Sequence, residues 1–215
     1  MAQKFNRIGG VDMQNEIIIG VVYNAALLLV LSVIYNAFFV QYGKNAIWKY
    51  VIIGTVIGFI GILLMLTPVK LIHGVFFDTR SILISVAAMF FGFIPTIIAA
   101  VVVCTYRIII GGAGALMGVL VTLSSSAIGL LWYQFRLKKI NTLNFPASNN
   151  KRFVYFEFYF AGVIVHLAML LCMLALPQDI IQRVFSYMWL PVLLIYPIGS
   201  LLLASVLLNG LKQNQ

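Results

Sequence analysis

Long apolar runs separated by short polar segments dominate the chain. We predict helices over seven of these runs: Glu16–Val40, Tyr50–Leu66, Ser81–Phe91, Ile94–Ile110, Ala113–Phe135, Phe153–Leu176 and Tyr187–Asn209. Most of them reach the roughly 20 residues that a transmembrane helix needs, but the third is too short and the fourth is marginal. The pattern therefore predicts an all-α, polytopic transmembrane bundle of five to seven spans, with a short helical hairpin at about residues 80–110.

The sequence GFIP joins the two short helices of this hairpin. Gly92 allows a tight turn, and Pro95 favours the start of a new helix. A hairpin of this kind returns to the side of the membrane that it left, whether or not each arm crosses completely. The direction of the later helices is therefore the same for five spans as for seven.

Composition supports a membrane domain along the whole chain. The chain has 215 residues, of which 63% are hydrophobic and 9% are charged, and its mean hydropathy is +1.07. A soluble globular domain carries about 25% charged residues. No polar stretch is long enough for a separate soluble domain, and the first 15 residues contain no apolar segment of the signal-peptide type. We therefore expect residues 1–215 to form one transmembrane domain.

The distribution of charge predicts the orientation. The net charge is +9, and five cations lie in the acid-free loop Arg136–Arg152, namely Arg136, Lys138, Lys139, Lys151 and Arg152. Such clustering is typical of a cytoplasmic loop. We therefore place Gln41–Lys49 and the C-terminus in the cytoplasm, and Pro177–Ser186 and the N-terminus outside. Nucleic-acid binding is excluded, because it needs a basic face on a soluble surface.

Three charged residues flank the short hairpin within apolar sequence. Asp78 and Arg80 precede it, and Arg107 lies near its end, 27 residues after Arg80. Each arm of about 13 residues rises roughly 20 Å, less than the roughly 30 Å hydrocarbon core. We therefore expect both arginines at the same depth on the outward side, below the headgroups. An uncompensated cation there is unfavourable by about 2.5–3.5 kcal/mol.

Two interpretations account for these charges. In the structural one, Asp78 neutralises one arginine or caps the helix after it, and the other arginine extends to lipid headgroups. In the functional one, Arg80 and Arg107 clamp a small anion, because a guanidinium binds carboxylate or phosphate in a bidentate manner. One aspartate does not neutralise two arginines, so an exchangeable anion fits as a third member.

The glycines after Arg107 divide into two groups. Gly111 and Gly112 lie where the next helix begins, and we expect their amides to open toward an anionic ligand. Gly114 and Gly118 lie on one face of that helix, where small residues favour close packing of a neighbouring helix.

No catalytic or metal-binding pattern is present. Cys104 and Cys172 lie within apolar runs, and His73 and His166 have no ligands at metal spacing. No nucleophile–base pair or phosphate-binding loop occurs. We therefore expect no metal, no cofactor and no enzyme activity in this chain. We also expect His166, Asn24 and Asn36 to form hydrogen bonds between helices.

An ordered series of these motifs resembles a known family. The series is an Asp-x-Arg before a short helix, a Gly/Pro turn, a Tyr-Arg pair and Gly-Gly-x-Gly. Its members here are Asp78, Arg80, Gly92, Pro95, Tyr106, Arg107, Gly111, Gly112 and Gly114. This part of the chain is similar to the core of the LytS–YhcK type five-transmembrane receptor module. The resemblance covers residues 50–135 well, and the other helices fit only as generic spans.

The resemblance implies a sensor in the bacterial inner membrane that signals to a cytoplasmic histidine kinase or diguanylate cyclase. It implies a small carboxylate as ligand, bound by Arg80 and Arg107, and a homodimer, because such output enzymes usually work as dimers. The chain departs from carboxylate-binding relatives at Gly118 and Val121, where they have polar groups. It also ends without an output domain, which implies a truncated receptor or a separate output partner. The alternative is a substrate-binding subunit of a small-molecule importer, similar to S-components.

Overall fold

The computed structural model describes residues 22–31, 33, 47–66, 69–72, 75–137 and 151–213. A short helix, Val22–Leu31, comes first. The labelled elements follow as α2 (Ile47–Leu66), β1 (Val69–Ile72), β2 (Val75–Phe77), α3 (Arg80–Phe91), α4 (Phe93–Ile110), α5 (Ala115–Trp132), α6 (Lys151–Cys172) and α7 (Gln178–Gln213). A π-helical turn, Tyr133–Leu137, continues α5, and a 3-10 turn, Met173–Ala175, continues α6. The all-α bundle is confirmed, with one small β-hairpin added.

Most predicted helices have the observed bounds to within three residues. Tyr50–Leu66, Ser81–Phe91 and Ile94–Ile110 correspond to α2, α3 and α4. The predicted helix Glu16–Val40 lies largely outside the described residues, and Val22–Leu31 is its described part. The loop Arg136–Arg152 also lies mostly outside them.

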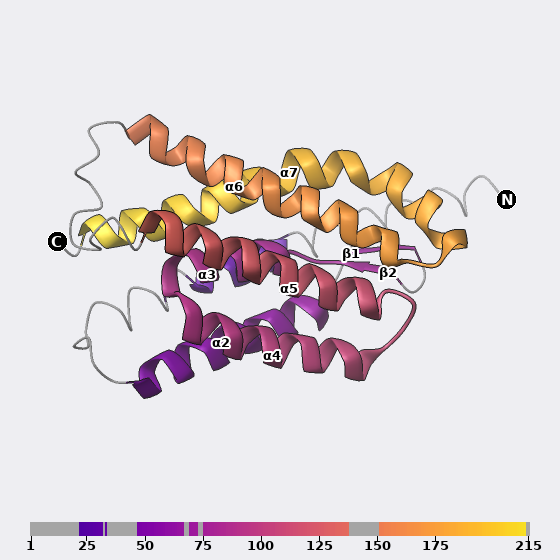
Figure 1. The fold of residues 1–215 in the computed structure, drawn as a ribbon, viewed down its shortest axis with the longest axis horizontal. Helices are drawn as coiled ribbons and strands as arrows, with labels where there is room; N and C mark the ends of the chain where they lie inside the picture. The colour runs from indigo at the N-terminus through magenta and orange to yellow at the C-terminus, as the bar shows by residue number, and fades with distance from the viewer. Residues whose placement is uncertain are drawn as a thin grey trace, which may run out of the picture.

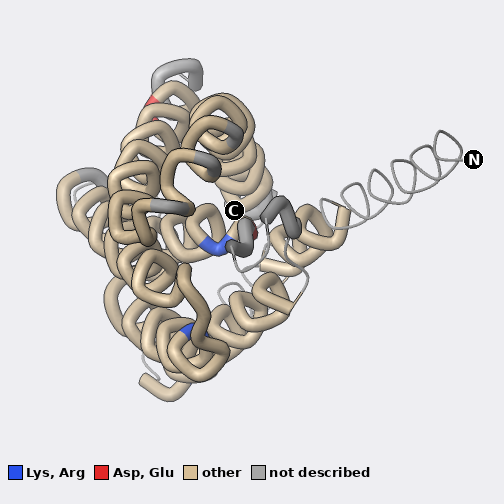
Figure 2. Tube along the Cα trace, turned by 90° about the vertical axis from the view of Figure 1, so that its right-hand side faces the viewer, with Lys and Arg blue, Asp and Glu red and all other residues tan. Residues whose placement is uncertain are grey.

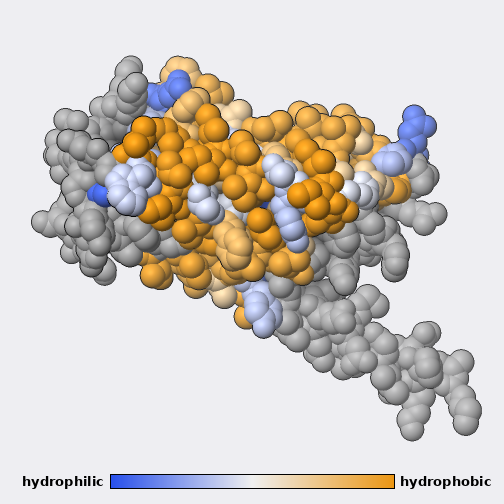
Figure 3. All heavy atoms as spheres, turned by 90° about the horizontal axis from the view of Figure 1, so that it is seen from below, coloured by the Kyte–Doolittle hydropathy of each residue, from blue (hydrophilic) through white to orange (hydrophobic). Residues whose placement is uncertain are grey.

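The outer surface of the bundle is apolar, as a membrane requires. Five helical segments in the described part of the chain are long and apolar enough to cross a bilayer, namely Ile47–Leu66, Phe93–Ile110, Ala115–Phe135, Tyr155–Ala175 and Met188–Asn209. Large apolar side chains face outward, including Ile109 and Phe135. Figure 3 shows a mostly hydrophobic face between the two ends of the molecule, and charged positions are few along the described part of the tube in Figure 2. The chain is therefore a multi-pass membrane protein.

Helix α3 lies at the centre of the bundle. In Figure 1, α2 and α4 form one flank, α6 and α7 form the opposite flank, and α5 runs between them with α3 behind it. All 12 residues of α3 are buried. Its length of about 18 Å is too short to cross the membrane. The hairpin of β1 and β2, which pair antiparallel, precedes it.

The ends of the helices alternate as the predicted topology requires. Figure 1 places the starts of α2 and α6, the turn between α3 and α4 and the C-terminal end of α7 at one end of the bundle. The β-hairpin, the α4–α5 connection and the α6–α7 connection lie at the other end. The starts of α2 and α6, which adjoin the basic segments 41–49 and 136–152 in the sequence, therefore lie at the same end. That this end faces the cytoplasm remains a prediction.

The predicted turn between the two short helices is confirmed at Gly92. This residue alone separates α3 from α4, and its φ of +77° favours glycine. A Cβ atom built on Gly92 would also lie 3.0 Å from the Tyr133 ring. The tight turn therefore needs glycine both for its backbone conformation and for space.

The last helix begins earlier than predicted. We expected Pro177–Ser186 to be an outer loop, but α7 begins at Gln178. Ile180, Ile181, Val184 and Met188 pack against an apolar cluster that includes Met169 and Met173 of the preceding helical segment. Their spacing of three and four residues gives this stretch a helical apolar face, which outweighs the polar residues between them.

Three glycines allow α2 to pack tightly against α4. Gly54, Gly58 and Gly61 follow one another at spacings of four and three residues. Cβ atoms built on them would lie between 2.5 and 2.8 Å from atoms of α4. Side chains at these positions would therefore push the two helices apart.

We expect Gly58→Leu to lower the free energy of unfolding by about 1–3 kcal/mol, as overpacking of a close contact does. A Cβ at this position would lie 2.8 Å from Val102 Cβ. Unfolding of the purified protein in detergent measures the change. Thr55→Leu, on the exposed face of the same helix, is the matched control, and equal stability of the two variants would contradict the packing assignment.

Candidate functional site

The charged residues before α3 lie deep inside the protein. Helix α3 is six residues shorter than α4, and the two helices meet at Gly92. The start of α3 therefore lies roughly 9 Å short of the far end of α4. Asp78 is 5% exposed and Arg80 is 8% exposed. The Asp-x-Arg motif thus lies within the bundle rather than at its surface.

Asp78 pairs with Arg80, as one of its two predicted roles requires, but it is not the N-cap of α3, which is Thr79. Its Oδ1 accepts a hydrogen bond from the backbone amide of Arg80, the first residue of α3, at 3.0 Å. The same oxygen accepts a charge-assisted hydrogen bond from Arg80 Nε at 2.7 Å. Arg80 Nη1 donates to Met65 Sδ of α2 at 2.9 Å, and a thioether sulfur is only a weak acceptor.

Arg107 is buried on the neighbouring helix α4. It is 5% exposed, and its Nη1 donates to the carbonyl of Gly111 at 3.2 Å. Arg80 begins the adjacent helix α3, three residues nearer than Arg107 to the turn at Gly92. That the two arginines lie at one depth in the membrane stays a prediction.

Gly118 of α5 makes room for the Arg107 side chain. A Cβ atom built on Gly118 would lie 2.6 Å from Arg107 Nε and 3.1 Å from its Cδ. We expected Gly118 to allow close packing of a neighbouring helix. The neighbouring helix is α4, and its Arg107 side chain is the group that packs against Gly118. Gly118, which we predicted to serve helix packing alone, therefore leaves the space that the Arg107 side chain occupies.

A stripe of small residues on α5 faces the centre of the bundle. Gly118 is followed by Thr122, Ser125 and Gly129, all of them buried. Thr122 Oγ1 donates to the Gly118 carbonyl at 2.9 Å, and a Cβ built on Gly129 would lie 2.5 Å from the carbonyl oxygen of Ser85 in α3. Ser125 belongs to the run Ser124–Ser126, for which packing within the bundle was the expectation, whereas Thr122 and Gly129 were not predicted. The spacing of three and four residues along the stripe is the signal that indicates them.

Gly111 differs from its predicted role, whereas the role expected for the Gly112 amide stays a prediction. Gly111 and Gly112 have positive φ values of 68° and 86°, which favour glycine. The Gly111 amide donates to the Arg107 carbonyl at 3.2 Å, so it ends α4 and is not open toward a ligand. Helix α5 begins only at Ala115. Tyr106 is partly buried and packs against the apolar core.

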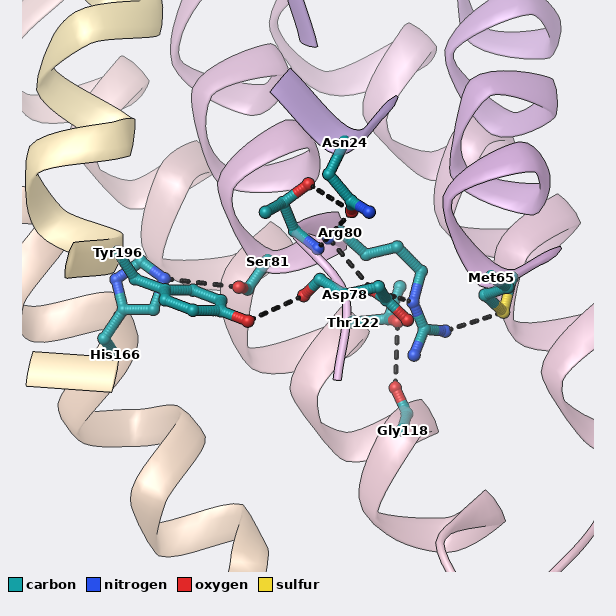
Figure 4. Close-up of polar contacts among 10 residues, drawn as sticks. Asn24, Met65, Asp78, Arg80, Ser81, Gly118, Thr122, His166 and Tyr196 are labelled. Atoms are coloured by element: carbon teal, nitrogen blue, oxygen red, sulfur yellow. Dashed lines mark hydrogen bonds and ion pairs between the residues drawn. The ribbon is translucent and has the colours of Figure 1, made fainter. Parts of the chain in front are cut away.

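Four successive residues at the start of α3 contact four different helices (Figure 4). We call Asp78, Thr79, Arg80 and Ser81 the junction. The Asp78 carbonyl accepts from Tyr196 Oη of α7 at 3.5 Å. Their other partners are Asn24 Oδ1 for Thr79, Met65 Sδ for Arg80 and His166 Nε2 for Ser81. A displacement of the junction would therefore change contacts with α2 on one flank of the bundle and with α6 and α7 on the other.

His166 joins α6 to the junction, as the expected hydrogen bond between helices. Its Nδ1 lies 2.6 Å from the Gly162 carbonyl, so Nδ1 carries the proton and donates. In the neutral ring, Nε2 then accepts from Ser81 Oγ at 3.2 Å. The ring also packs edge-on against Tyr196, with centroids 5.1 Å apart. His166 and Tyr196 thus connect α6, α7 and α3 through one contact network.

The family model described as 5TMR of 5TMR-LYT matches residues 18–209. The chain belongs to this family. As a 5TMR-LYT chain it is a membrane sensor module of signalling proteins, and such a module is not catalytic. The match confirms the resemblance found in the motif series, and it extends over the first and last helices as well. No curated protein and no solved structure matches the chain.

Proposed function

We propose that this 5TMR-LYT module detects a small anion that binds between Arg80 and Arg107. The observation that carries the proposal is the burial of two guanidiniums, 8% and 5% exposed, on the adjacent helices α3 and α4, where Asp78 pairs with Arg80. Like charges in a low-dielectric interior repel strongly. A bound anion would offset that repulsion, and a planar guanidinium suits carboxylate or phosphate.

The contact between Arg80 and Met65 is weak enough for an anion to replace it. Arg80 Nη1 donates to the sulfur of Met65, which is a much weaker acceptor than a carboxylate oxygen. An anion that replaced this contact would draw the Arg80 guanidinium away from α2. Gly112 and Tyr106 would border the anion from the Arg107 side, and Asp78 would hold Arg80 in place.

The junction supplies a route from the anion to the last helix. Asp78 holds Arg80 through its carboxylate and α7 through its carbonyl. A ligand changes a conformational equilibrium only through its different affinities for two states. Here the two states would differ in the position of the junction, and Tyr196 would pass that difference to α7. Helix α7 would then act on a cytoplasmic kinase or diguanylate cyclase, in a homodimer in the bacterial inner membrane.

Thermal unfolding with acetate and with its neutral isostere acetamide tests the anion site. A ligand that binds only the folded protein raises the unfolding temperature. We expect acetate, but not acetamide, to stabilise the wild type at constant ionic strength, and Arg80→Ala and Arg107→Ala to abolish the effect. Lys49→Ala removes a cation at the start of α2 and should leave it intact. Equal stabilisation of the wild type and both arginine variants would rule out the clamp.

Tyr196→Phe separates binding from transmission. It removes the hydroxyl that donates to the Asp78 carbonyl and keeps the aromatic ring that packs against His166. We expect the acetate-dependent rise in unfolding temperature to stay within about twofold of that of the wild type. The lost hydrogen bond joins two neutral groups outside the anion site, so its removal should change the affinity for acetate little. The effect of acetate on the position of α7 should be lost. A variant that keeps both responses would exclude Tyr196 from the route.

A further inference from the structure

Only one of the two carboxylate oxygens of Asp78 accepts hydrogen bonds from described residues. Its Oδ1 accepts two hydrogen bonds from Arg80, from the backbone amide and from Nε. Its Oδ2 is buried and has no hydrogen-bond partner among the described residues, although the side chain is only 3% exposed. Arginine–carboxylate pairs are frequently bidentate and then use both oxygens. This pair leaves a charged acceptor in the interior.

The nearby hydroxyl groups already donate elsewhere. Tyr196 Oη, which reaches Asp78, donates to its backbone carbonyl. The hydroxyl of Thr79, the next residue in the chain, donates to Asn24 Oδ1 at 2.9 Å. A buried charged oxygen without a donor is unfavourable. A donor brought by a ligand would therefore be bound tightly at Oδ2.

We propose that the ligand is a small 2-hydroxycarboxylate, whose hydroxyl donates to Asp78 Oδ2 while its carboxylate binds the arginines. This inference rests on the proposed anion site and adds a second recognition element to it. The site would then distinguish a hydroxy acid from the matching simple acid. It would also reject a keto acid, because a ketone oxygen facing Oδ2 places two acceptors together.

Charge balance favours a hydroxyl over an ammonium group as the donor. Asp78, Arg80 and Arg107 together carry a formal charge of +1, from one carboxylate and two guanidiniums. A monocarboxylate with a neutral hydroxyl brings this sum to zero, whereas an amino-acid zwitterion leaves it at +1 and a dicarboxylate reverses it. In a buried site, uncompensated charge is strongly disfavoured.

Binding of four three-carbon acids to the purified wild type tests the inference: lactate, propionate, 2-fluoropropionate and alanine. A hydrogen bond to a charged group changes affinity by about 10- to 100-fold. We expect lactate to bind at least tenfold more tightly than the other three. 2-Fluoropropionate is close to lactate in size and lacks only the donor, so this comparison needs no protein variant.

Asp78→Asn provides the reciprocal measurement. Asparagine keeps the Oδ1 acceptor for Arg80 and replaces Oδ2 by a donating NH₂ group. We expect this variant to lose the preference for lactate and to bind pyruvate more tightly than lactate. Equal, arginine-dependent binding of lactate and propionate would overturn the hydroxyl inference and leave the anion site standing. Tighter binding of alanine than of lactate would overturn the charge argument, and binding of none of these acids would overturn both proposals.

Discussion

Replacing Asp78 by alanine is expected to lower the free energy of unfolding by about 3–5 kcal/mol, the usual effect of removing one partner of a buried ion pair. Arg80, which is 8% exposed, would lose its carboxylate partner, and its backbone amide at the start of α3 would lose its acceptor. Unfolding of the purified protein in detergent measures the change.

Two matched variants separate the effect of the Arg80 charge from that of the hydrogen bond to the Arg80 amide. Asp78→Asn keeps the Oδ1 acceptor and should be less destabilised than the alanine variant. In Asp78→Ala/Arg80→Met the buried cation is gone, and stability should return most of the way to the wild type, because apolar replacement of a buried pair is often neutral. If the double variant is as unstable as Asp78→Ala, an uncompensated Arg80 is not the cause.

Gly118→Ala is expected to weaken anion binding by at least about tenfold while leaving the fold stable. The added methyl group would lie 2.6 Å from Arg107 Nε, so the flexible arginine side chain must move. A displaced guanidinium loses its charge-assisted hydrogen bonds to the anion, each of which contributes about 1.5–3 kcal/mol. Titration of acetate against the unfolding temperature measures the loss.

Gly129→Ala on the same helix is the matched control for Gly118→Ala. Its methyl group would lie 2.5 Å from the backbone carbonyl of Ser85, which does not move aside easily. This variant should therefore lose stability through the α3–α5 contact and keep the affinity of its folded form. An affinity loss in Gly118→Ala no greater than that in Gly129→Ala would show that the contact with Arg107 does not matter for binding.

Local sequence signals predicted the parts of the fold that depend on local chemistry. The turn at Gly92 and the pairing of Asp78 with Arg80 both involve residues adjacent or nearly adjacent in the chain. Apolar length alone identified the spans. Counting residues along two helical arms led us to expect Arg80 and Arg107 at a common depth, which stays a prediction.

The β-hairpin and the start of α7 could not be predicted in the same way. A short apolar run such as Val69–Phe77 is compatible with either a strand or a buried helix, and the structure has two strands there. At α7, the polar residues after Pro177 indicated a loop. Ile180, Val184 and Met188 form an apolar face that packs on the end of the preceding helical segment. This packing stabilises a helix there.

The junction depends on contacts between distant parts of the sequence. Ser81 and His166 are 85 residues apart, and Asp78 and Tyr196 are 118 residues apart. No local pattern states which buried polar groups will meet, because that depends on how whole helices pack. Likewise, Gly118 has the spacing of an ordinary packing glycine, and only the packed structure shows that the Arg107 side chain lies across it.

The central claim is that an anion at Arg80 and Arg107 moves α7. Its most direct test is the distance between spin labels at two exposed positions, Leu131 at the end of α5 and Asn209 near the end of α7, with Cys104 and Cys172 replaced by serine. We predict that acetate shifts this distance by about 1–2 Å, the size of helix displacements in allosteric proteins, and that Arg107→Ala abolishes the shift. An unchanged distance in a protein that acetate stabilises against unfolding would contradict the account.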